Sequence, residues 1–379
     1  MKIGVPTEVR SEECRVAATP ETVKKMIGLG CQVLVQKGAG ERASVTDAAY
    51  KAVGAELVSA KEVFKVDLIL KVRAPETAEI KAMKAGTVLI GLLEPFNQPQ
   101  LKTIAEQGIT AFSLEALPRN SRAQSMDVLS SQANVAGYKA VLLGSHFYQR
   151  FMPMLMTSAG TVKAARVLVL GAGVAGLQAI ATAKRLGAVV EASDVRPAVK
   201  EQVESLGAKF LDVFYETEEE KETAAGVGGY ARPMSAAWMQ RQAALVAQRA
   251  AEADIVISSA LIPGREPPVL IRAETVANMK PGSVIIDMAA GSGSMLLGNI
   301  GCGNCPLTEA NKVVLKHGVT IVGYTNLPSL VSADASAFYA RNILEFLRLL
   351  ISEGNFHIPA DDELVTASLM CKDGQMTKK

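Results

Sequence analysis

The sequence predicts an α/β protein with two Rossmann-like domains, of which the first is discontinuous and the second is a doubly wound parallel sheet. Its 379 residues are enough for two domains of the usual ~100–200 residues each. Short apolar runs alternate with helical patterns in both halves of the chain, and a glycine-rich turn joins a strand to a helix near residue 171. A composition of 49% hydrophobic and 21% charged residues is typical of a globular chain rather than a disordered one.

The first domain is expected over residues 1–126. Helices are expected from Pro20, with Thr19 as N-cap, and over Asp47–Val53 and Asn97–Gln107. Apolar runs between them predict strands at Ile3–Val5, Val33–Gln36, Leu68–Val72, Val88–Ile90 and Thr110–Leu114. Because strands interleaved with helices form parallel βαβ units, this half predicts an α/β domain.

A long helix over 127–151 is expected to connect this domain to a second one over 152–326. The second series of strands is predicted at Val167–Leu170, Val189–Ser193, Lys209–Val213, Ile255–Ser259, Val284–Asp287 and Val319–Val322. Six strands with helices between them suit a doubly wound sheet. After Pro328 the pattern is helical to about Ile351, and we expect residues 327–379 to return to the first domain.

Charge and hydropathy exclude several classes of protein. Forty basic and 38 acidic residues give a net charge of +2, without the basic stripe of a nucleic-acid binder. A membrane-spanning helix needs about 20 mostly apolar residues, and the best run, 167–183, is interrupted by glycines, so no direct membrane span is expected. The five scattered cysteines indicate reduced thiols in a cytoplasmic compartment. Cys302 and Cys305 form a C-x-x-C but lack the second ligand pair of a zinc site, so no metal is expected.

Two irregular segments interrupt the second domain. Residues 216–232 combine a run of acidic residues with glycines and predict a long surface loop, either a lid or a disordered insertion. Residues 291–303 predict an unusually apolar, glycine-rich loop.

The glycine-rich turn has the sequence Gly171-Ala172-Gly173-Val174-Ala175-Gly176. A bare G-x-G-x-x-G is a weak signal, but here it follows the strand 166–170 and opens the helix 177–185. In that context the glycines permit a tight turn, close approach of a pyrophosphate and close helix–strand packing, while the helix N-terminus faces the phosphates. The motif therefore predicts a dinucleotide site.

The end of the next strand indicates which dinucleotide binds. Asp194 follows Ser193, and a carboxylate there accepts hydrogen bonds from the 2′-hydroxyl of NAD but repels the 2′-phosphate of NADP. Arg196 lies close enough in sequence to soften that preference. We expect Asp194, Val195 and Arg196 to contact NAD(H).

The histidines argue against most dehydrogenase chemistry. Reactions on alcohols, hydroxy acids or amino acids need a general acid or base, most often His or Lys. His146, His317 and His357 all lie away from a strand end that faces the glycine loop. Direct hydride exchange between two nicotinamides needs no such group, because the protein only has to position the two rings.

A polar cluster at the end of the first domain is a candidate for gripping a nicotinamide carboxamide. It contains Arg119, Arg122, Gln124 and Asp127 in a chain otherwise rich in apolar residues. The alternative interpretation is a charged helix N-terminus with Asp127 as a capping acid.

Several longer segments, taken together, resemble the NAD(H)-binding α subunit of proton-translocating NAD(P) transhydrogenase. The match runs from Met1 to the last helix, and its most specific segments are residues 122–127, 171–188, 200–205, 260–264 and 280–287. The resemblance places a nucleotide-facing catalytic set on Arg119, Gln124, Asp127 and Ser130. It also places nucleotide contacts on Tyr230 of a mobile loop and on Ala260 and Leu261.

The resemblance implies hydride transfer from NADH to NADP⁺ held on a partner β subunit, coupled to proton translocation through a separate membrane-spanning subunit. It also implies a homodimer, located in the cytoplasm and peripheral on the inner face of the cell membrane through those partners. Three features depart from the family pattern: the apparent insertion 291–302, Leu330 in place of an arginine, and Asn120 in place of an apolar residue.

Two other functions stay open on the sequence alone. Alanine dehydrogenase resembles this chain in its two-domain plan, and Arg15 and Lys71 match positions that bind its substrate carboxylate. Its catalytic histidine has no counterpart, because no histidine precedes His146, and Ala290 and Gly291 stand where its catalytic aspartate is expected. A non-enzymatic NAD(H)-sensing module is the other alternative.

Overall fold

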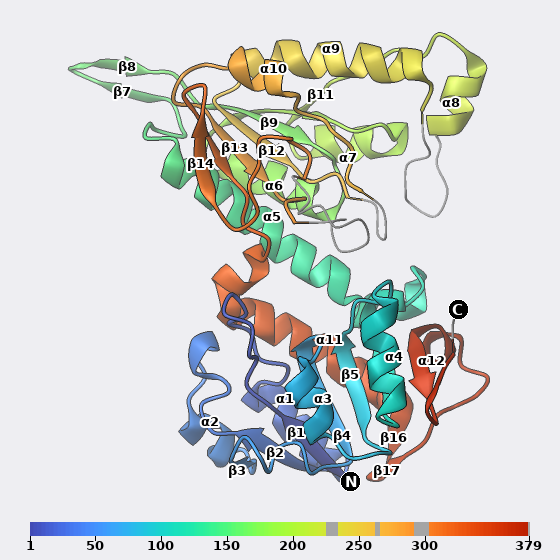
Figure 1. Ribbon diagram of the computed structural model, residues 1–379. Helices are drawn as coiled ribbons and strands as arrows, with labels where there is room; N and C mark the ends of the chain where they lie inside the picture. The colour runs from blue at the N-terminus through green and yellow to red at the C-terminus, as the bar shows by residue number, and fades with distance from the viewer. Residues whose placement is uncertain (225–233, 262–265, 292–302, 378–379) are drawn as a thin grey trace. The chain divides into compact units, whose positions relative to one another are not determined.

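The computed structural model describes residues 1–224, 234–261, 266–291 and 303–377 (Figure 1). These residues form two compact units: unit 1 comprises 1–132 and 328–379, and unit 2 comprises 133–327. Unit 1 is therefore discontinuous in sequence. In the described part of the chain, no helix is both long enough and apolar enough to cross a membrane.

Unit 1 is built on an eight-stranded sheet with the order β19-β18-β6-β5-β4-β1-β2-β3. Its strands are β1 (Lys2–Val5), β2 (Gln32–Gln36), β3 (Glu56–Val58), β4 (Leu68–Arg73), β5 (Val88–Leu92), β6 (Thr110–Ser113), β18 (Leu369–Lys372) and β19 (Gln375–Met376). The strands from β3 to β6 are parallel to their neighbours, whereas β18 pairs antiparallel with β6. The order 3-2-1-4-5-6 of the first six strands is that of a Rossmann sheet, as predicted.

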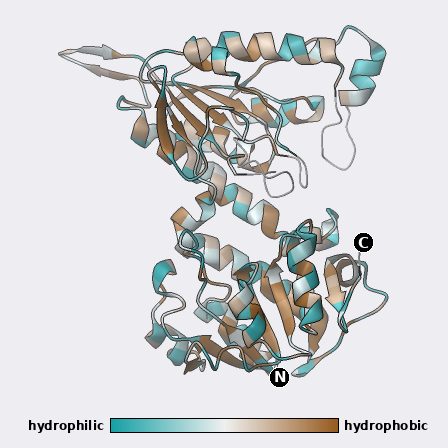
Figure 2. Cartoon of the chain, in the orientation of Figure 1, coloured by the Kyte–Doolittle hydropathy of each residue, from teal (hydrophilic) through white to brown (hydrophobic). Residues whose placement is uncertain are grey.

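Helices cover both faces of this sheet. They are α1 (Pro20–Gly28), α2 (Asp47–Ala52), α3 (Thr77–Ala82), α4 (Gln98–Glu106), α11 (Ser332–Leu350) and α12 (Glu363–Ser368). In β4, Leu68 and Leu70 join the core beneath α1 and α11, while Ile69 joins the core beneath α3 and α4. Because alternate residues of a strand face opposite sides of a sheet, a strand buried on both faces is a continuous apolar run. Figure 2 shows these strands as apolar and the outer helix faces as polar.

Unit 2 is built on a seven-stranded sheet with the order β11-β10-β9-β12-β13-β15-β14. Its strands are β9 (Arg166–Leu170), β10 (Val189–Ser193), β11 (Lys209–Phe210), β12 (Ile255–Ser258), β13 (Val284–Asp287), β14 (Val313–Lys316) and β15 (Val319–Val322). All neighbours are parallel except the edge strand β14, which runs antiparallel to β15. The predicted doubly wound parallel sheet is confirmed.

The helices of unit 2 also lie on both faces of its sheet. They are α6 (Val174–Arg185), α7 (Lys200–Ser205), α8 (Glu218–Ala224), α9 (Ala236–Glu252) and α10 (Ala273–Ala277), and α5 (Val128–Phe147) belongs to unit 2 from residue 133. Val167 and Val169 pack with residues of α5 and α6, whereas Leu168 and Leu170 pack with residues of α9 and α10. The carboxyl ends of β9, β10 and β12 meet at one edge of this sheet, where a ligand is expected.

The connecting helix is shorter than predicted. It ends at Phe147 rather than at residue 151, because Gln149 takes a φ of +27°, outside the right-handed helical region. An exposed hairpin of β7 (Leu155–Thr157) and β8 (Gly160–Val162) follows, which the sequence pattern does not predict. Its side chains are mostly exposed, so it has no apolar alternation that would mark it as strand.

Three other predictions need correction. The strand expected over 209–213 ends at Phe210. The loop expected over 216–232 begins with α8, since Glu220 accepts a hydrogen bond from the backbone N–H of Glu216 and pairs with Arg241 at 2.7 Å. The tail of unit 1 is not irregular, because β18 and β19 extend the sheet and a hairpin of β16 (Ile351–Ser352) and β17 (Asn355–Phe356) follows α11.

Candidate nucleotide site

The glycine loop connects β9 to α6, as predicted. Gly171 has a φ of +94°, which disfavours any residue with a Cβ. A Cβ added to Gly176 would lie 1.8 Å from the carbonyl oxygen of Gly171, so helix and turn approach too closely for a side chain. A Cβ on Gly173 would have only Arg196 within 4 Å, at 3.9 Å. The middle glycine therefore faces open space, which fits close approach of a pyrophosphate.

Backbone and side-chain hydrogen bonds hold the turn. The N–H of Gly171 donates to the carbonyl of Ser193, and the Ser259 hydroxyl donates to the carbonyl of Gly171 at 3.0 Å. Sequence reasoning missed Ser259, although a small hydroxyl directly after β12 was a usable signal. Gly173 is the N-cap of α6 and has no side chain to cap it. Val174 and Ala175 form the first turn, where free helix N–H groups attract anions.

Asp194 is engaged with two parts of its surroundings. Its Oδ2 accepts a hydrogen bond from the N–H of Ala172 at 2.8 Å, so the carboxylate supports the glycine loop directly. The guanidinium of Arg196 binds it in a bidentate way, with Nε 2.9 Å from Oδ1 and Nη2 2.8 Å from Oδ2. The Asp194 side chain is 6% exposed and that of Arg196 is 21% exposed. Arg196 therefore neutralises the carboxylate instead of standing free.

The two glycines should respond differently to an added methyl group. We expect Gly176→Ala to lose about 1–3 kcal/mol of stability, because the turn and α6 must separate. Gly173→Ala should lose less than about 1 kcal/mol but weaken NADH binding, because its Cβ occupies the open side of the loop. Thermal unfolding and NADH titration of both variants check this. Equal losses of stability would contradict the distinct roles.

A buried carboxylate organises the neighbouring strand end. Asp287 of β13 accepts hydrogen bonds from the N–H groups of Ala289, Asn304 and Cys305 and from the hydroxyls of Ser258 and Thr308. Burial raises the pKa of Asp287, against the opposing effect of these donors. Because Ala289 and Asn304 bind the same Oδ1, one side chain holds both sides of the segment 290–303.

Asn304 extends this anchor to β12. Its Nδ2 donates to the carbonyl of Ala260 at 2.8 Å, while Leu261 is exposed. Ala260 and Leu261 thus lie at the edge of the sheet where the glycine loop lies. Neither Asp287 nor Asn304 was recognised from the sequence. The spacing of Asp287 from the family's Asn-Cys-Pro stretch gave no indication of the contact.

In unit 1 the structure brings Asp127 and Ser130 together. Asp127 Oδ1 accepts the N–H of Ser130 at 2.9 Å and Oδ2 accepts its hydroxyl at 2.5 Å. Asp127 therefore caps α5, as the alternative interpretation of this segment expected. Gln124 is exposed on the short helix η3 (Ser121–Met126), and Arg119 is exposed just before it.

Two residues of the same segment have structural partners. The Asn120 side chain accepts the N–H of Ala123 at 3.0 Å and caps η3, which explains a polar residue where the family pattern has an apolar one. Arg122 forms an ion pair with Asp362, the N-cap of α12. Arg122 is therefore occupied within unit 1.

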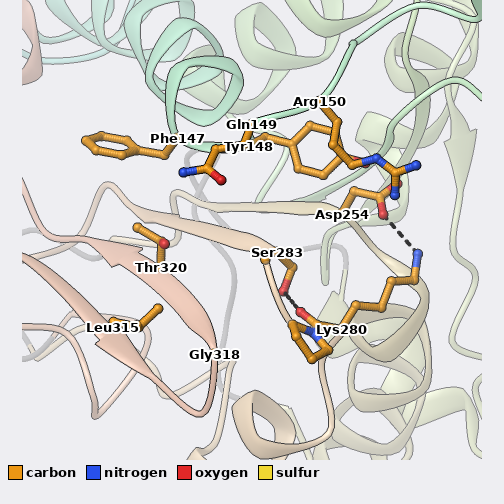
Figure 3. A pocket seen from close by; sticks show the side chains of 12 residues that line it. Phe147, Tyr148, Gln149, Arg150, Asp254, Lys280, Ser283, Leu315, Gly318 and Thr320 are labelled. Carbon is orange, nitrogen blue, oxygen red and sulfur yellow. Dashed lines mark hydrogen bonds and ion pairs between the residues drawn. The ribbon is translucent and has the colours of Figure 1, made fainter. Parts of the chain in front are cut away.

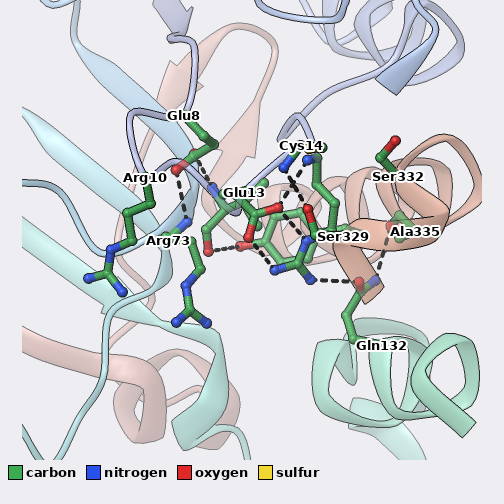
Figure 4. A network of polar contacts seen from close by, with 12 residues as sticks. Glu8, Arg10, Glu13, Cys14, Arg73, Gln132, Ser329, Ser332 and Ala335 are labelled. Carbon is green, nitrogen blue, oxygen red and sulfur yellow. Dashed lines mark hydrogen bonds and ion pairs between the residues drawn. The ribbon is translucent and has the colours of Figure 1, made fainter. Parts of the chain in front are cut away.

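Arg15 and Lys71, the positions shared with alanine dehydrogenase, are both buried and neutralised by internal carboxylates (Figure 4). Arg15 makes a bidentate pair with Glu13, at 2.8 and 2.6 Å. Lys71 Nζ lies 2.7 Å from Glu79 Oε1 and 3.3 Å from Glu8 Oε2. Burial alone would lower the pKa of Lys71, but the two carboxylates outweigh it and raise that pKa. A substrate carboxylate would have to displace these partners.

The thiols fit a structural role. Cys305 and Cys371 are fully buried, and burial raises the pKa of each to about 11. Since the thiolate is the reactive form, we expect both to react with iodoacetamide at pH 8 at least about a hundredfold more slowly than in unfolded chain. Mass spectrometry against the half-exposed Cys14 checks this. Labelling of Cys305 as fast as Cys14 would contradict it. Cys302 lies outside the described residues.

The best-formed pocket of unit 2 is not the nucleotide site. It has a volume of about 370 Å³ and lies near Asp254, Ser283 and Thr320, at the amino ends of the strands (Figure 3). Lys280 spans it to pair with Asp254 at 3.0 Å. Ligands of doubly wound sheets bind at the carboxyl ends, so this pocket lies at the wrong edge.

The remaining predicted site features are partly outside the structure. Tyr230 and most of the 291–302 segment lie outside the described residues. Leu330 is 47% exposed and lies in η5 (Leu327–Val331). Within the described ranges, no group of three or more His, Cys, Asp or Glu side chains is placed to hold a metal ion.

Comparison with known proteins places the chain in a family. The model of the alanine dehydrogenase/PNT N-terminal domain matches residues 4–136, and that of the alanine dehydrogenase/PNT C-terminal domain matches residues 140–379. An NAD(P) transhydrogenase subunit alpha of Rhodospirillum rubrum is 50% identical over 384 aligned residues, covering 99% of this chain and 97% of that protein. The crystal structure of transhydrogenase from Sinorhizobium meliloti is 42% identical and superposes with a TM-score of 0.84, covering 100% of this chain and 99% of that one.

Alanine dehydrogenase is a more distant relative. The enzyme of Bacillus subtilis is 28% identical over 384 aligned residues, covering 100% of this chain and 93% of that protein. The whole-length match at 50% identity therefore decides between the two branches. The chain belongs to the alanine dehydrogenase/PNT family and, within it, to the NAD(P) transhydrogenase α subunits.

Proposed function

We propose that this chain binds NAD(H) in unit 2 and takes part in hydride transfer from NADH to NADP⁺ held on a partner β subunit. The observation that carries the proposal is the glycine loop, with open space at Gly173 and the Asp194 carboxylate hydrogen-bonded to Ala172. A dinucleotide phosphate fits the uncapped start of α6, and a ribose hydroxyl fits Asp194. When bound, the reduced nicotinamide supplies the hydride.

The chain's own contribution to that step is positioning. Gln124 offers an exposed amide, which can pair with a carboxamide as donor and acceptor. Asp127 and Ser130 form a hydrogen-bonded pair beside it in sequence, and Arg119 adds a positive charge. We propose that these four residues contact the nicotinamide end of the nucleotide and hold it for transfer.

Two observations favour this proposal over an alanine dehydrogenase. Arg15 and Lys71 are already paired with Glu13, Glu8 and Glu79, so neither cation offers a free site for a substrate carboxylate. Unit 1 contains a single histidine, His357, beyond α11 and far in sequence from the nucleotide-facing segment. Proton transfer to an amino-acid substrate would need a group in that place.

We further propose that the chain works as a homodimer with a β subunit that holds NADP(H) and a separate membrane-spanning subunit. Proton translocation would take place in those partners, with this chain in the cytoplasm, peripheral on the inner face of the cell membrane. The names of the relatives, which include the words "subunit alpha", support the existence of other subunits. Light scattering of the purified chain checks the dimer.

One reconstitution separates the three candidate functions. The purified chain is mixed with the NADP(H)-binding domain of a transhydrogenase β subunit, NADH and an NADP⁺ analogue whose reduced form absorbs at its own wavelength. We expect reduction of the analogue only when both proteins are present. NADH oxidation with pyruvate and ammonia by the chain alone would identify an alanine dehydrogenase, and NADH binding without transfer would leave a sensing module.

A further inference from the structure

A buried amide of α11 ties together both sides of the nucleotide-facing segment in unit 1. Asn342 is 9% exposed and lies on the face of α11 that meets η3 and the start of α5. Its Nδ2 donates to the carbonyl oxygen of Ser125 at 2.7 Å, and its Oδ1 accepts the hydroxyl of Ser131 at 2.6 Å. One side chain thus uses its donor and its acceptor on two separate pieces of the chain.

The proposed catalytic groups lie directly beside these two attachment points. Gln124 precedes Ser125, and Ser130 precedes Ser131 in sequence. Asp127 lies between them, at the junction of η3 and α5. We infer that Asn342 is a positioning residue for hydride transfer, which fixes the spacing of Gln124, Asp127 and Ser130. The inference rests on the proposed function of those three residues.

A second buried amide secures the same turn of α5. Gln132 accepts a hydrogen bond from Arg15 Nη1 at 2.8 Å through its Oε1 and donates to the carbonyl of Ala335 at 3.0 Å (Figure 4). Glu13 orients the guanidinium of Arg15 from the other side. Arg15 therefore has a role in this chain that needs no substrate, because it holds the first turn of α5 against α11.

Such support matters because a hydride-transfer site tolerates little displacement. Misplacement of reacting groups by about 1 Å can cost as much as a hundredfold in rate. The 3₁₀ helix η3 is a short element with few internal hydrogen bonds, which by itself holds side chains loosely. The Asn342 amide supplies bonds that η3 lacks, and both are shielded from competing water.

The test compares Asn342→Ala with Tyr339→Phe. Tyr339 is a matched control, because it is fully buried on the same helix and its hydroxyl donates to the carbonyl of Lys71 at 2.8 Å, away from η3 and α5. Both variants lose buried hydrogen bonds of α11 and should lower the unfolding temperature. In the reconstituted system, Asn342→Ala should slow hydride transfer at saturating nucleotide by about tenfold or more. Its NADH affinity, and both properties of Tyr339→Phe, should stay within about twofold of the unchanged chain.

A milder variant keeps the inference testable if Asn342→Ala does not fold. Ser131→Ala removes only one of the two bonds, and we expect a loss of about two- to fivefold in transfer rate. Transfer rates within twofold of the unchanged chain in both variants would overturn the inference, as would equal losses in rate and in NADH affinity. If the unchanged chain itself transfers no hydride, the proposed function fails first and this inference fails with it.

Discussion

Asp194→Ala is expected to weaken NADH binding by about 10- to 100-fold and to improve NADPH binding by about tenfold. A charge-assisted hydrogen bond contributes about 1.5–3 kcal/mol, and 1.4 kcal/mol corresponds to a factor of ten in affinity. The variant loses the acceptor for the ribose hydroxyl and also the support that Asp194 gives to the N–H of Ala172. It also releases the guanidinium of Arg196, which the carboxylate now holds at 2.8–2.9 Å.

The gain for NADPH follows from that release. An unpaired arginine beside the adenosine ribose can bind the 2′-phosphate in a bidentate way. Titration of NADH and NADPH by protein fluorescence or calorimetry measures both affinities. Asp212→Asn is the matched control, because Asp212 is an exposed carboxylate paired with Lys200 in the same unit. Unchanged NADH affinity in Asp194→Ala would show that the carboxylate has no role in nucleotide binding.

Gln124→Asn should slow hydride transfer by about 10- to 100-fold while NADH affinity falls less than about threefold. The substitution keeps the amide but shortens the side chain by one methylene, which withdraws it by more than 1 Å. Since Gln124 is exposed on η3, the change should leave the unfolding temperature nearly unaltered. Single-turnover transfer in the reconstituted system, beside NADH titration, separates rate from affinity.

A second glutamine serves as the control for this variant. Gln240 is exposed on α9 in unit 2, so Gln240→Asn makes the same chemical change on a surface with no proposed role. It should leave rate and affinity unchanged. Equal losses of rate and affinity in Gln124→Asn would mean that Gln124 contributes to binding without positioning the nicotinamide.

The sheets were predictable because their strands are buried on both faces. Runs such as 167–170 and 284–287 need apolar residues at every position, and such runs are visible without knowledge of any partner. The glycine loop was predictable for a related reason, since its constraints are local. Gly171 needs a positive φ, and Gly176 lies five residues away beside its carbonyl.

Short and exposed elements escaped prediction. The hairpin of β7 and β8 projects exposed side chains and so lacks a periodic pattern. The strand β18 exists because its backbone pairs with β6, which is distant in sequence. Its composition resembles that of any partly buried segment, and only the partner makes it a strand.

The sequence by itself determined the fold class of both units, the nucleotide loop and the acid that follows β10, because each depends on residues close together in the chain. Only the tertiary structure decided what the charged and amide side chains do. Asn342 meets Ser125 across 217 residues of sequence, and Gln132 meets Ala335 across 203. Arg15 and Lys71 change from candidate substrate ligands to buried, neutralised supports once Glu13, Glu8 and Glu79 are in place. A buried charge takes its role from the groups that solvate it, and those groups are assembled only when the chain folds.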